Sequence, residues 1–254
     1  MPGPWTLNGF YDAMEMTGLY EAISLRESCR SFASAPAAEV WNSLQCCAQA
    51  CALPGTRIAL GLCDTSLFQP LGGFGMKFEN VRCFAAVIVG ENTPENVVNA
   101  GIGGEMVMLS AVEQGLGGVW VSGTYKRSKV PLSLEPGEKI KALMALGVPD
   151  LPPKPPLARK RKALELLCEP GFDKAPSPFR EAALVVRAAP SAMNLQPWRM
   201  RYGPEENTMT LSVKQSFQRL DLGIAVSHVL LALGKTPASF ALSENGLSAT
   251  VTLE

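Results

Sequence analysis

Two apolar segments far apart in the chain carry the same residue types at the same internal spacing. The four matched positions are Gly101, Ile102, Val107 and Leu109 in the first segment and Gly223, Ile224, Val229 and Leu231 in the second. Both segments have apolar residues at the spacing of a helix with a buried face. A helical stretch, a proline-containing loop and an arginine-bearing strand also occur in both halves, at 48–59 and 187–200. The pattern favours two diverged copies of one unit, although two unrelated amphipathic helices can share such residues.

Hydrophobic periodicity and the positions of glycine and proline predict the remaining elements. Helices are expected at about 11–27, 37–52, 93–113, 178–188 and 222–234. Strands are expected at about 57–63, 84–89, 119–121, 140–146, 198–202 and 208–213. Residues 149–162 contain five prolines and five basic residues, which indicates a crossing between the halves. We therefore divide the chain into a first half at 1–150, a crossover at 151–176 and a second half at 177–254, together one compact unit.

The composition excludes several classes of protein. Hydrophobic residues make up 47% and charged residues 18% of the chain, which is typical of a globular protein and not of a disordered one. Lys plus Arg equals Asp plus Glu, 23 against 23, so no charge excess predicts a nucleic-acid or membrane-surface partner. The N-terminus lacks the basic and apolar regions of a signal peptide, and no apolar run approaches the roughly 20 residues of a membrane span. We therefore expect a cytoplasmic protein.

The seven cysteines do not have the paired spacing of a disulfide framework. The nearest approach to a metal-binding pattern is Cys46, Cys47 and Cys51 in a helical stretch. A zinc site has few other ligands available, because His228 is the only histidine. We interpret the cysteines as reduced structural thiols and expect no metal site. His228 lies on the apolar face of its helix, which favours a satisfied histidine at the edge of the core over a catalytic one.

Two motifs carry the functional argument. Residues 189–198 read Ala-Pro-Ser-Ala-Met-Asn-Leu-Gln-Pro-Trp, which predicts a loop offering backbone amides and the Asn194 side chain to a flat polar ligand. Residues 22–32 contain the pattern Arg-x-Ser-x-Arg at Arg26, Ser28 and Arg30. The loop resembles the Pro-Ser-x-x-Asn-x-Gln-Pro-Trp loop of FMN-dependent nitroreductases, and the second pattern resembles the phosphate motif of the same family. The resemblance covers roughly residues 20–240.

The resemblance implies roles for five basic or hydroxyl residues. Arg26 and Ser28 match residues that hold the FMN phosphate, for which arginine offers bidentate, charge-assisted hydrogen bonds. Arg30 matches a residue that reaches toward the ribityl chain and the pyrimidine edge of the ring, where a cation stabilises the charge of the reduced flavin. Arg159 and Arg161 match a basic pair that closes on the phosphate, although the proline that usually follows is absent.

The resemblance also implies where the flavin ring lies. Residues matching the contacts at the ring edge and the dimethylbenzene side are Pro190, Ser191, Ala192 and Asn194, with alanine replacing what is often a second serine. The glycine-rich segment 115–123 resembles the stretch that passes beside the reactive N5 and places Trp120, Ser122 and Gly123 at the cofactor. The Ser122 and Gly123 amides would donate to N5 and O4, where many family members have Glu-Gly.

The family's fold is α+β, with a mixed, mainly antiparallel sheet surrounded by helices, and two subunits share each flavin site. Here both motifs lie in one chain, which resembles a single-chain branch in which two fused, diverged halves imitate the dimer. Such a chain builds one flavin site and leaves its pseudo-symmetric counterpart degenerate. The resemblance therefore allows two oligomeric states, a monomer whose two halves form a pseudo-dimer or a homodimer of such chains.

The implied activity is that of an FMN-dependent NAD(P)H oxidoreductase. NAD(P)H reduces the flavin and leaves, and a small-molecule electron acceptor such as a nitroaromatic or a quinone takes its place in a ping-pong reaction. The protein positions and the flavin reacts, so we name no catalytic side chain. The alternative is a flavin-binding storage or sensor protein without turnover. Neither a Gly-x-Ser-x-Gly elbow nor a Rossmann fingerprint supports a competing function.

Overall fold

The structure, a computed structural model, describes residues 16–68, 77–155, 158–234 and 236–254. Its helices are α2 (Met16–Leu25), α3 (Ala38–Ala50), α4 (Pro94–Glu113), α5 (Ser177–Val186) and α6 (Arg219–Leu233). Its strands are β1 (Phe32–Ser34), β2 (Thr56–Leu62), β3 (Cys83–Val89), β4 (Gly117–Val121), β5 (Lys139–Pro149), β6 (Arg199–Gly203), β7 (Thr208–Ser212), β8 (Ala238–Leu242) and β9 (Ser248–Leu253).

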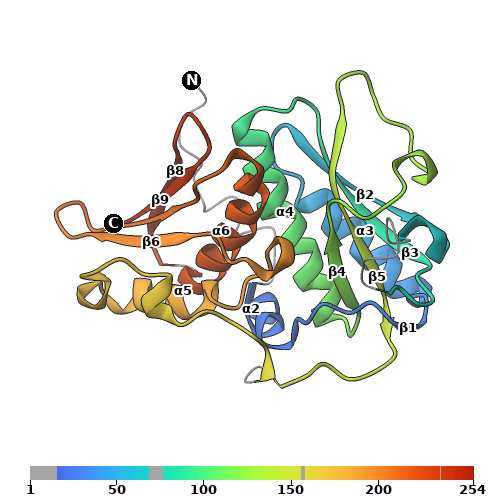
Figure 1. The fold of residues 1–254 in the computed structure, drawn as a ribbon, viewed down its shortest axis with the longest axis horizontal. Helices are drawn as coiled ribbons and strands as arrows, with labels where there is room; N and C mark the ends of the chain where they lie inside the picture. The colour runs from blue at the N-terminus through green and yellow to red at the C-terminus, as the bar shows by residue number, and fades with distance from the viewer. Residues whose placement is uncertain (1–15, 69–76, 156–157, 235) are drawn as a thin grey trace.

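The strands form two antiparallel sheets, which lie on either side of α4 and α6 (Figure 1). In the first sheet β2 pairs with β3 and β3 with β5, and β5 pairs in addition with β4 and, near its end, with β1. The second sheet has the order β6-β7-β9-β8. Each sheet is built by the same succession of elements, namely helix, strand, strand, helix, strand, strand. With β4 matched to β8 and β5 to β9, the order β2-β3-β5-β4 repeats as β6-β7-β9-β8.

The centre of the molecule is the contact between α4 and α6. Residues of α4 are buried without interruption from Val97 to Val112, so this mainly apolar helix is covered on all sides and lies inside the protein. It begins at the N-cap Thr93, whose hydroxyl accepts a hydrogen bond from the Asn96 amide at 3.1 Å. It ends before Gly115, which has a φ of +82°, a conformation that favours glycine.

Gly101 and Gly223 allow the two central helices to approach closely. A Cβ atom at Gly101 would lie 2.4 Å from the Leu220 carbonyl oxygen and 2.9 Å from the Gly223 Cα. A Cβ atom at Gly223 would lie 2.0 Å from the Val98 carbonyl oxygen and 2.9 Å from the Gly101 Cα. Each glycine therefore meets the same backbone atoms of the other helix, and the contact has local two-fold symmetry. Of the repeated sequence positions, Gly101 and Gly223 thus also occupy equivalent places in this contact.

Each predicted helix and strand has a counterpart, with ends shifted by a few residues. Residues 11–15 of the first predicted helix lie outside the described residues. The α+β class is confirmed, and the sheet is more regular than expected, because every pairing between named strands is antiparallel. Among the described residues, parallel pairing occurs only in isolated bridges such as that between Ser28 and Gly118.

Three strands, β1, β8 and β9, were not predicted. Burial alternates along β9, with Ala249 and Val251 inside, so its period of two was readable in the sequence. Strand β1 has only three residues, too few for a periodic pattern. The proposed division of the chain remains a prediction, although the strands of the first sheet all lie within 32–149 and those of the second within 199–253.

One helical stretch among the described residues, Ser216–Leu233, is long and apolar enough to cross a membrane. The sequence analysis overlooked this stretch. Of its residues 67% are buried inside the protein, and α6, which makes up most of it, packs against α4 and α5. A core helix of a globular protein has these properties.

Candidate functional site

Arg26 follows the last residue of α2 and is almost completely buried, with 3% of its surface exposed. Within the described part of the chain, its Nε and Nη1 atoms are buried without a hydrogen-bond partner. Burial lowers the pKa of this guanidinium, and the nearby Glu105 carboxylate acts in the opposite direction. A buried cation with unpaired donors is costly unless an anion completes its hydrogen bonds. The donors of Arg26 therefore fit an anionic ligand such as a phosphate.

Two arginines of the crossover lie beside Arg26. Arg159 donates to the Arg26 carbonyl oxygen at 2.9 Å and to the Leu25 carbonyl oxygen at 3.3 Å. Arg161 has a pKa lowered to about 10, first by burial and then by the charges of Arg26, Arg159 and Arg187. These like charges repel each other, and a bound phosphate would relieve that repulsion.

The loop of the second half meets this cluster through Asn194. Arg161 donates to the Asn194 side-chain oxygen at 2.8 Å, and the Asn194 amide group donates to the Lys160 carbonyl oxygen at 3.0 Å. Met193, Asn194 and Gln196 have φ values of +49°, +56° and +44°, which side chains rarely adopt. Such backbone strain persists only where surrounding contacts impose it.

Two contacts hold the strained loop. The Gln196 amide donates to the Ser191 hydroxyl at 2.8 Å, and the Ala192 amide donates to the Asp221 carboxylate at 3.1 Å. Burial raises the pKa of Asp221 to about 6, against the lowering effect of the Ala192 amide. The sequence analysis missed Asp221. Its signal was an acidic residue in the first turn of an otherwise apolar helix, close to the repeated Gly223.

A buried polar network lies next to the arginine cluster. Glu105, on α4, accepts a hydrogen bond from the Trp120 indole at 2.8 Å and lies 3.1 Å from Nε2 of His228. His228 Nδ1 lies 3.1 Å from the Val185 carbonyl oxygen, which can only accept, so Nδ1 carries a hydrogen.

His228 is satisfied, as expected, but it lies inside the core and not at its edge, with no exposed surface. Glu105 was not among the predicted site residues. The only local signal was an acidic residue in the middle of an apolar helix, and a second helix and a strand were needed to reveal its partners.

Ser28 and Arg30 lie where the chain runs from α2 toward the first sheet. The segment is aligned with β4, because Ser28 bridges Gly118 and the Cys29 amide donates to the Gly118 carbonyl oxygen at 3.0 Å. Arg30 donates to the Ser28 carbonyl oxygen at 3.4 Å, and its Nε is buried without a partner among the described residues. Burial lowers the pKa of Arg30.

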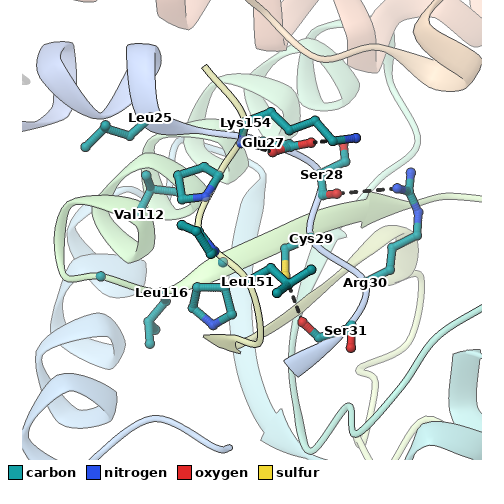
Figure 2. Close-up of a pocket in the computed structure, with 15 residues that line it drawn as sticks. Leu25, Glu27, Ser28, Cys29, Arg30, Ser31, Val112, Leu116, Leu151 and Lys154 are labelled. Atoms are coloured by element: carbon teal, nitrogen blue, oxygen red, sulfur yellow. Dashed lines mark hydrogen bonds and ion pairs between the residues drawn. The ribbon is translucent and has the colours of Figure 1, made fainter. Parts of the chain in front are cut away.

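Figure 2 shows Ser28 and Arg30 at the wall of a pocket of about 480 Å³, which Val112, Leu116 and Leu151 also line. A smaller pocket of about 310 Å³ lies between α2 and α5. Three of its lining residues are arginines, Arg159, Arg161 and Arg187. Neither pocket is lined by Trp120, Ser122, Gly123 or the 190–194 loop.

The structure thus groups the predicted site residues unevenly. Those that meet in one cluster are Arg26, Arg159, Arg161, Ser191, Ala192 and Asn194. Trp120 joins it through Glu105, while Ser28 and Arg30 lie on the adjoining strand side. Pro190 is buried at the base of the loop, and Ser122 and Gly123 are exposed in the bend after β4. These assignments remain predictions, of which Ser122 and Gly123 have the least geometric support.

The chain is similar to known proteins both in a family model of its sequence and in its fold. A family model described as "Putative TM nitroreductase" matches residues 18–233. A Thermotoga maritima protein described as a putative nitroreductase is 20% identical, with a TM-score of 0.66 over 94% of this chain and 95% of its own. Nitroreductase A of Vibrio parahaemolyticus is also 20% identical, with a TM-score of 0.47 over 61% of this chain and 77% of its own. None of the curated proteins matches the chain.

Proposed function

The chain belongs to the family described as putative TM nitroreductases, and from that premise we propose that it is an FMN-dependent NAD(P)H oxidoreductase. FMN, when bound, supplies two-electron chemistry that accepts a hydride from a reduced nicotinamide and passes electrons to an acceptor. The proposed acceptors are small nitroaromatic or quinone-like molecules, reduced in ping-pong order in the cytoplasm. We propose no nucleic-acid or membrane partner.

The observation that carries the proposal is the buried guanidinium of Arg26, with two nitrogens that lack partners among the described residues. Arg159 and Arg161 already donate to carbonyl oxygens and add two positive charges next to it, so Arg26 supplies the unpaired donors for the FMN phosphate. Ser191 and Asn194 would face the ring edge, while Arg30, Trp120 and the Ser122 and Gly123 amides would complete the site. Buried arginine donors exclude water from the phosphate and hold its orientation.

We further propose that one chain makes one flavin site from both halves. The repeated strand order and the reciprocal contact of Gly101 and Gly223 support a duplication. The contact between Arg161 and Asn194 supports a site shared between the crossover and the second half. No second chain is needed for that contact.

The test is a visible absorption spectrum recorded after addition of FMN and desalting, followed by anaerobic addition of NADPH and then NADH. Retained flavin bands that bleach with either nucleotide would support the oxidoreductase. Retained bands that resist both nucleotides but bleach with dithionite would point to the storage or sensor protein. A colourless protein after desalting would contradict both.

A further inference from the structure

Helix α3 ends in two thiol groups that face each other. Cys47 lies in its last turn and Cys51 is its C-cap residue, and their Sγ atoms are 3.7 Å apart. The Cys51 amide donates to the Cys47 carbonyl oxygen at 2.8 Å, so the two residues are separated by one helical turn. Residues four apart on a helix lie on one face, with Cβ atoms about 5–6 Å apart. A disulfide needs about 3.5–4.5 Å between these atoms, so the last turn of α3, where Cys51 is the C-cap, must adjust when the bond forms.

The two thiols differ in access to solvent. Cys47 is half-buried at the edge of the core and is therefore partly accessible. Cys51 has no exposed surface. Cys46, the preceding residue, is exposed. One turn of helix therefore contains an accessible thiol, an inaccessible thiol next to it and an exposed neighbour for comparison.

Hydrogen bonds make the two thiols chemically unequal. The Cys51 thiol and the Ser110 hydroxyl both bond to the Cys47 sulfur, which lowers the pKa of Cys47 to about 7. The same bond to Cys47, together with burial, raises the pKa of Cys51. Near neutral pH, Cys47 is partly thiolate while Cys51 keeps its proton. The thiolate is the nucleophilic form of cysteine.

We propose that Cys47 and Cys51 form a reversible dithiol–disulfide pair in which Cys47 attacks hydroperoxides and Cys51 resolves the product. In the first step the Cys47 thiolate attacks the peroxide, the O–O bond breaks, and the alcohol or water leaves with a proton from solvent. Cys47 is then a sulfenic acid. In the second step the Cys51 sulfur attacks the Cys47 sulfur, loses its proton and releases water. The peroxide is reduced by two electrons, and the two thiols are oxidised to one disulfide.

Peptide mapping tests the proposal, because one tryptic peptide, residues 31–57, contains all three cysteines of this region. The folded protein is treated with one equivalent of hydrogen peroxide, and the remaining thiols are then blocked with N-ethylmaleimide in denaturant, which also exposes Cys51. We expect the peptide to lose two hydrogens and to carry one maleimide, on Cys46. Dithiothreitol should restore three reactive thiols. A peptide that carries three maleimides after peroxide treatment would overturn the proposal.

Cysteine variants locate the reaction. Cys46→Ser should form the disulfide as the wild type does, whereas Cys47→Ser should not. Cys51→Ala should stop at a sulfenic acid on Cys47, which dimedone traps. Disulfide formation that persists in Cys47→Ser, or that disappears in Cys46→Ser, would contradict the assigned pair.

A rate measurement does not depend on disulfide formation. Removal of the Cys51 donor should slow alkylation of Cys47 by iodoacetamide at pH 7 about threefold, since the lost thiolate outweighs the gain in nucleophilicity. Thermal melting of Cys51→Ala confirms that the variant is folded. If that variant is unfolded, the wild type alone tests the proposal, because its Cys47 should react with iodoacetamide faster than the more exposed Cys46. An equal or slower rate at Cys47 would count against the proposal.

Discussion

At the scale of single residues, the arginine cluster and the 190–194 loop serve different parts of the proposed ligand. Arg26 offers buried donors suited to a phosphate, whereas Asn194 borders the arginine cluster and accepts a hydrogen bond from Arg161. Riboflavin has the ring and ribityl chain of FMN but lacks the phosphate. A comparison of the two ligands therefore separates the two contributions.

Arg26→Ala should weaken FMN binding by about thirtyfold or more, because hydrogen bonds to a charged group contribute roughly 2 kcal/mol, which corresponds to that change in Kd. Riboflavin binding should change little. Asn194→Ala should weaken the binding of FMN and of riboflavin by a similar factor. Arg201→Ala, which removes an exposed arginine of β6, should change neither affinity. Fluorescence titration of the wild type and the three variants gives the affinity of each protein for both ligands. Parallel losses of FMN and riboflavin in Arg26→Ala would remove Arg26 from the phosphate site.

Asp221 gives the protein a specific dependence of stability on pH. Its pKa is raised from 3.8 to about 6 in the folded state, so the folded protein binds more protons than the unfolded chain between these values. Stability from this group is therefore present below about pH 4 and decreases as the pH rises through 6. Asp221→Asn retains an oxygen for the Ala192 amide and removes the buried charge.

We expect Asp221→Asn to stabilise the protein at pH 7.5 by about 1–3 kcal/mol, the lower end reflecting the favourable N-terminus of α6. The advantage should disappear near pH 4. Urea denaturation of both proteins at the two pH values measures the difference. A gain that is independent of pH would show that the Asp221 charge is not its cause.

At the scale of elements, the α4–α6 contact depends on the absence of two side chains. Gly101→Ala and Gly223→Ala each place a methyl group closer than 3.0 Å to backbone atoms that no side-chain rotation can move. The helices must separate, and we expect each substitution to destabilise the protein by about 1–3 kcal/mol or more. Gly123→Ala is the matched control, because its Cβ meets no atom within 4 Å. Thermal melting that ranks the control with the other two would refute the close packing.

At the scale of the whole molecule, the question is whether a flavin site needs one chain or two. Arg26→Ala and Asn194→Ala each damage the proposed site from a different half. If two chains shared each site, as in a symmetric dimer, a mixed dimer would contain one undamaged site. If one chain builds the site, no mixture restores it.

We expect a co-refolded equal mixture of Arg26→Ala and Asn194→Ala to contain no more high-affinity FMN sites than the separate variants do. A two-chain site would instead restore about a quarter of the wild-type sites. Wild-type protein titrated with FMN provides the reference and should bind one FMN per chain. Restored binding in the mixture, or two FMN per chain, would contradict the single-chain site.

Much of the fold was predictable because its signals are local. A period of 3.6 residues identifies α3 and α4, an uninterrupted apolar run closed by Gly90 identifies β3, and a period of two identifies β7, each within a short window. The motifs at 26–30 and 190–194 are likewise contiguous, and so the family resemblance was readable from the sequence. Strand β9 had an alternating pattern as well and was missed because the prediction ended at α6, whereas β8 has no regular alternation.

Only the tertiary structure decided which distant residues meet. Glu105 gains its meaning from Trp120 and His228, and Asp221 gains its meaning from the Ala192 amide. The same holds for Cys47 and Ser110, which lie on different helices. Local patterns specify which face of an element is buried, whereas packing of α4 against α6 specifies what that face touches. The sequence by itself therefore determined most of the elements and the family, and the packing of those elements determined which candidate site residues meet.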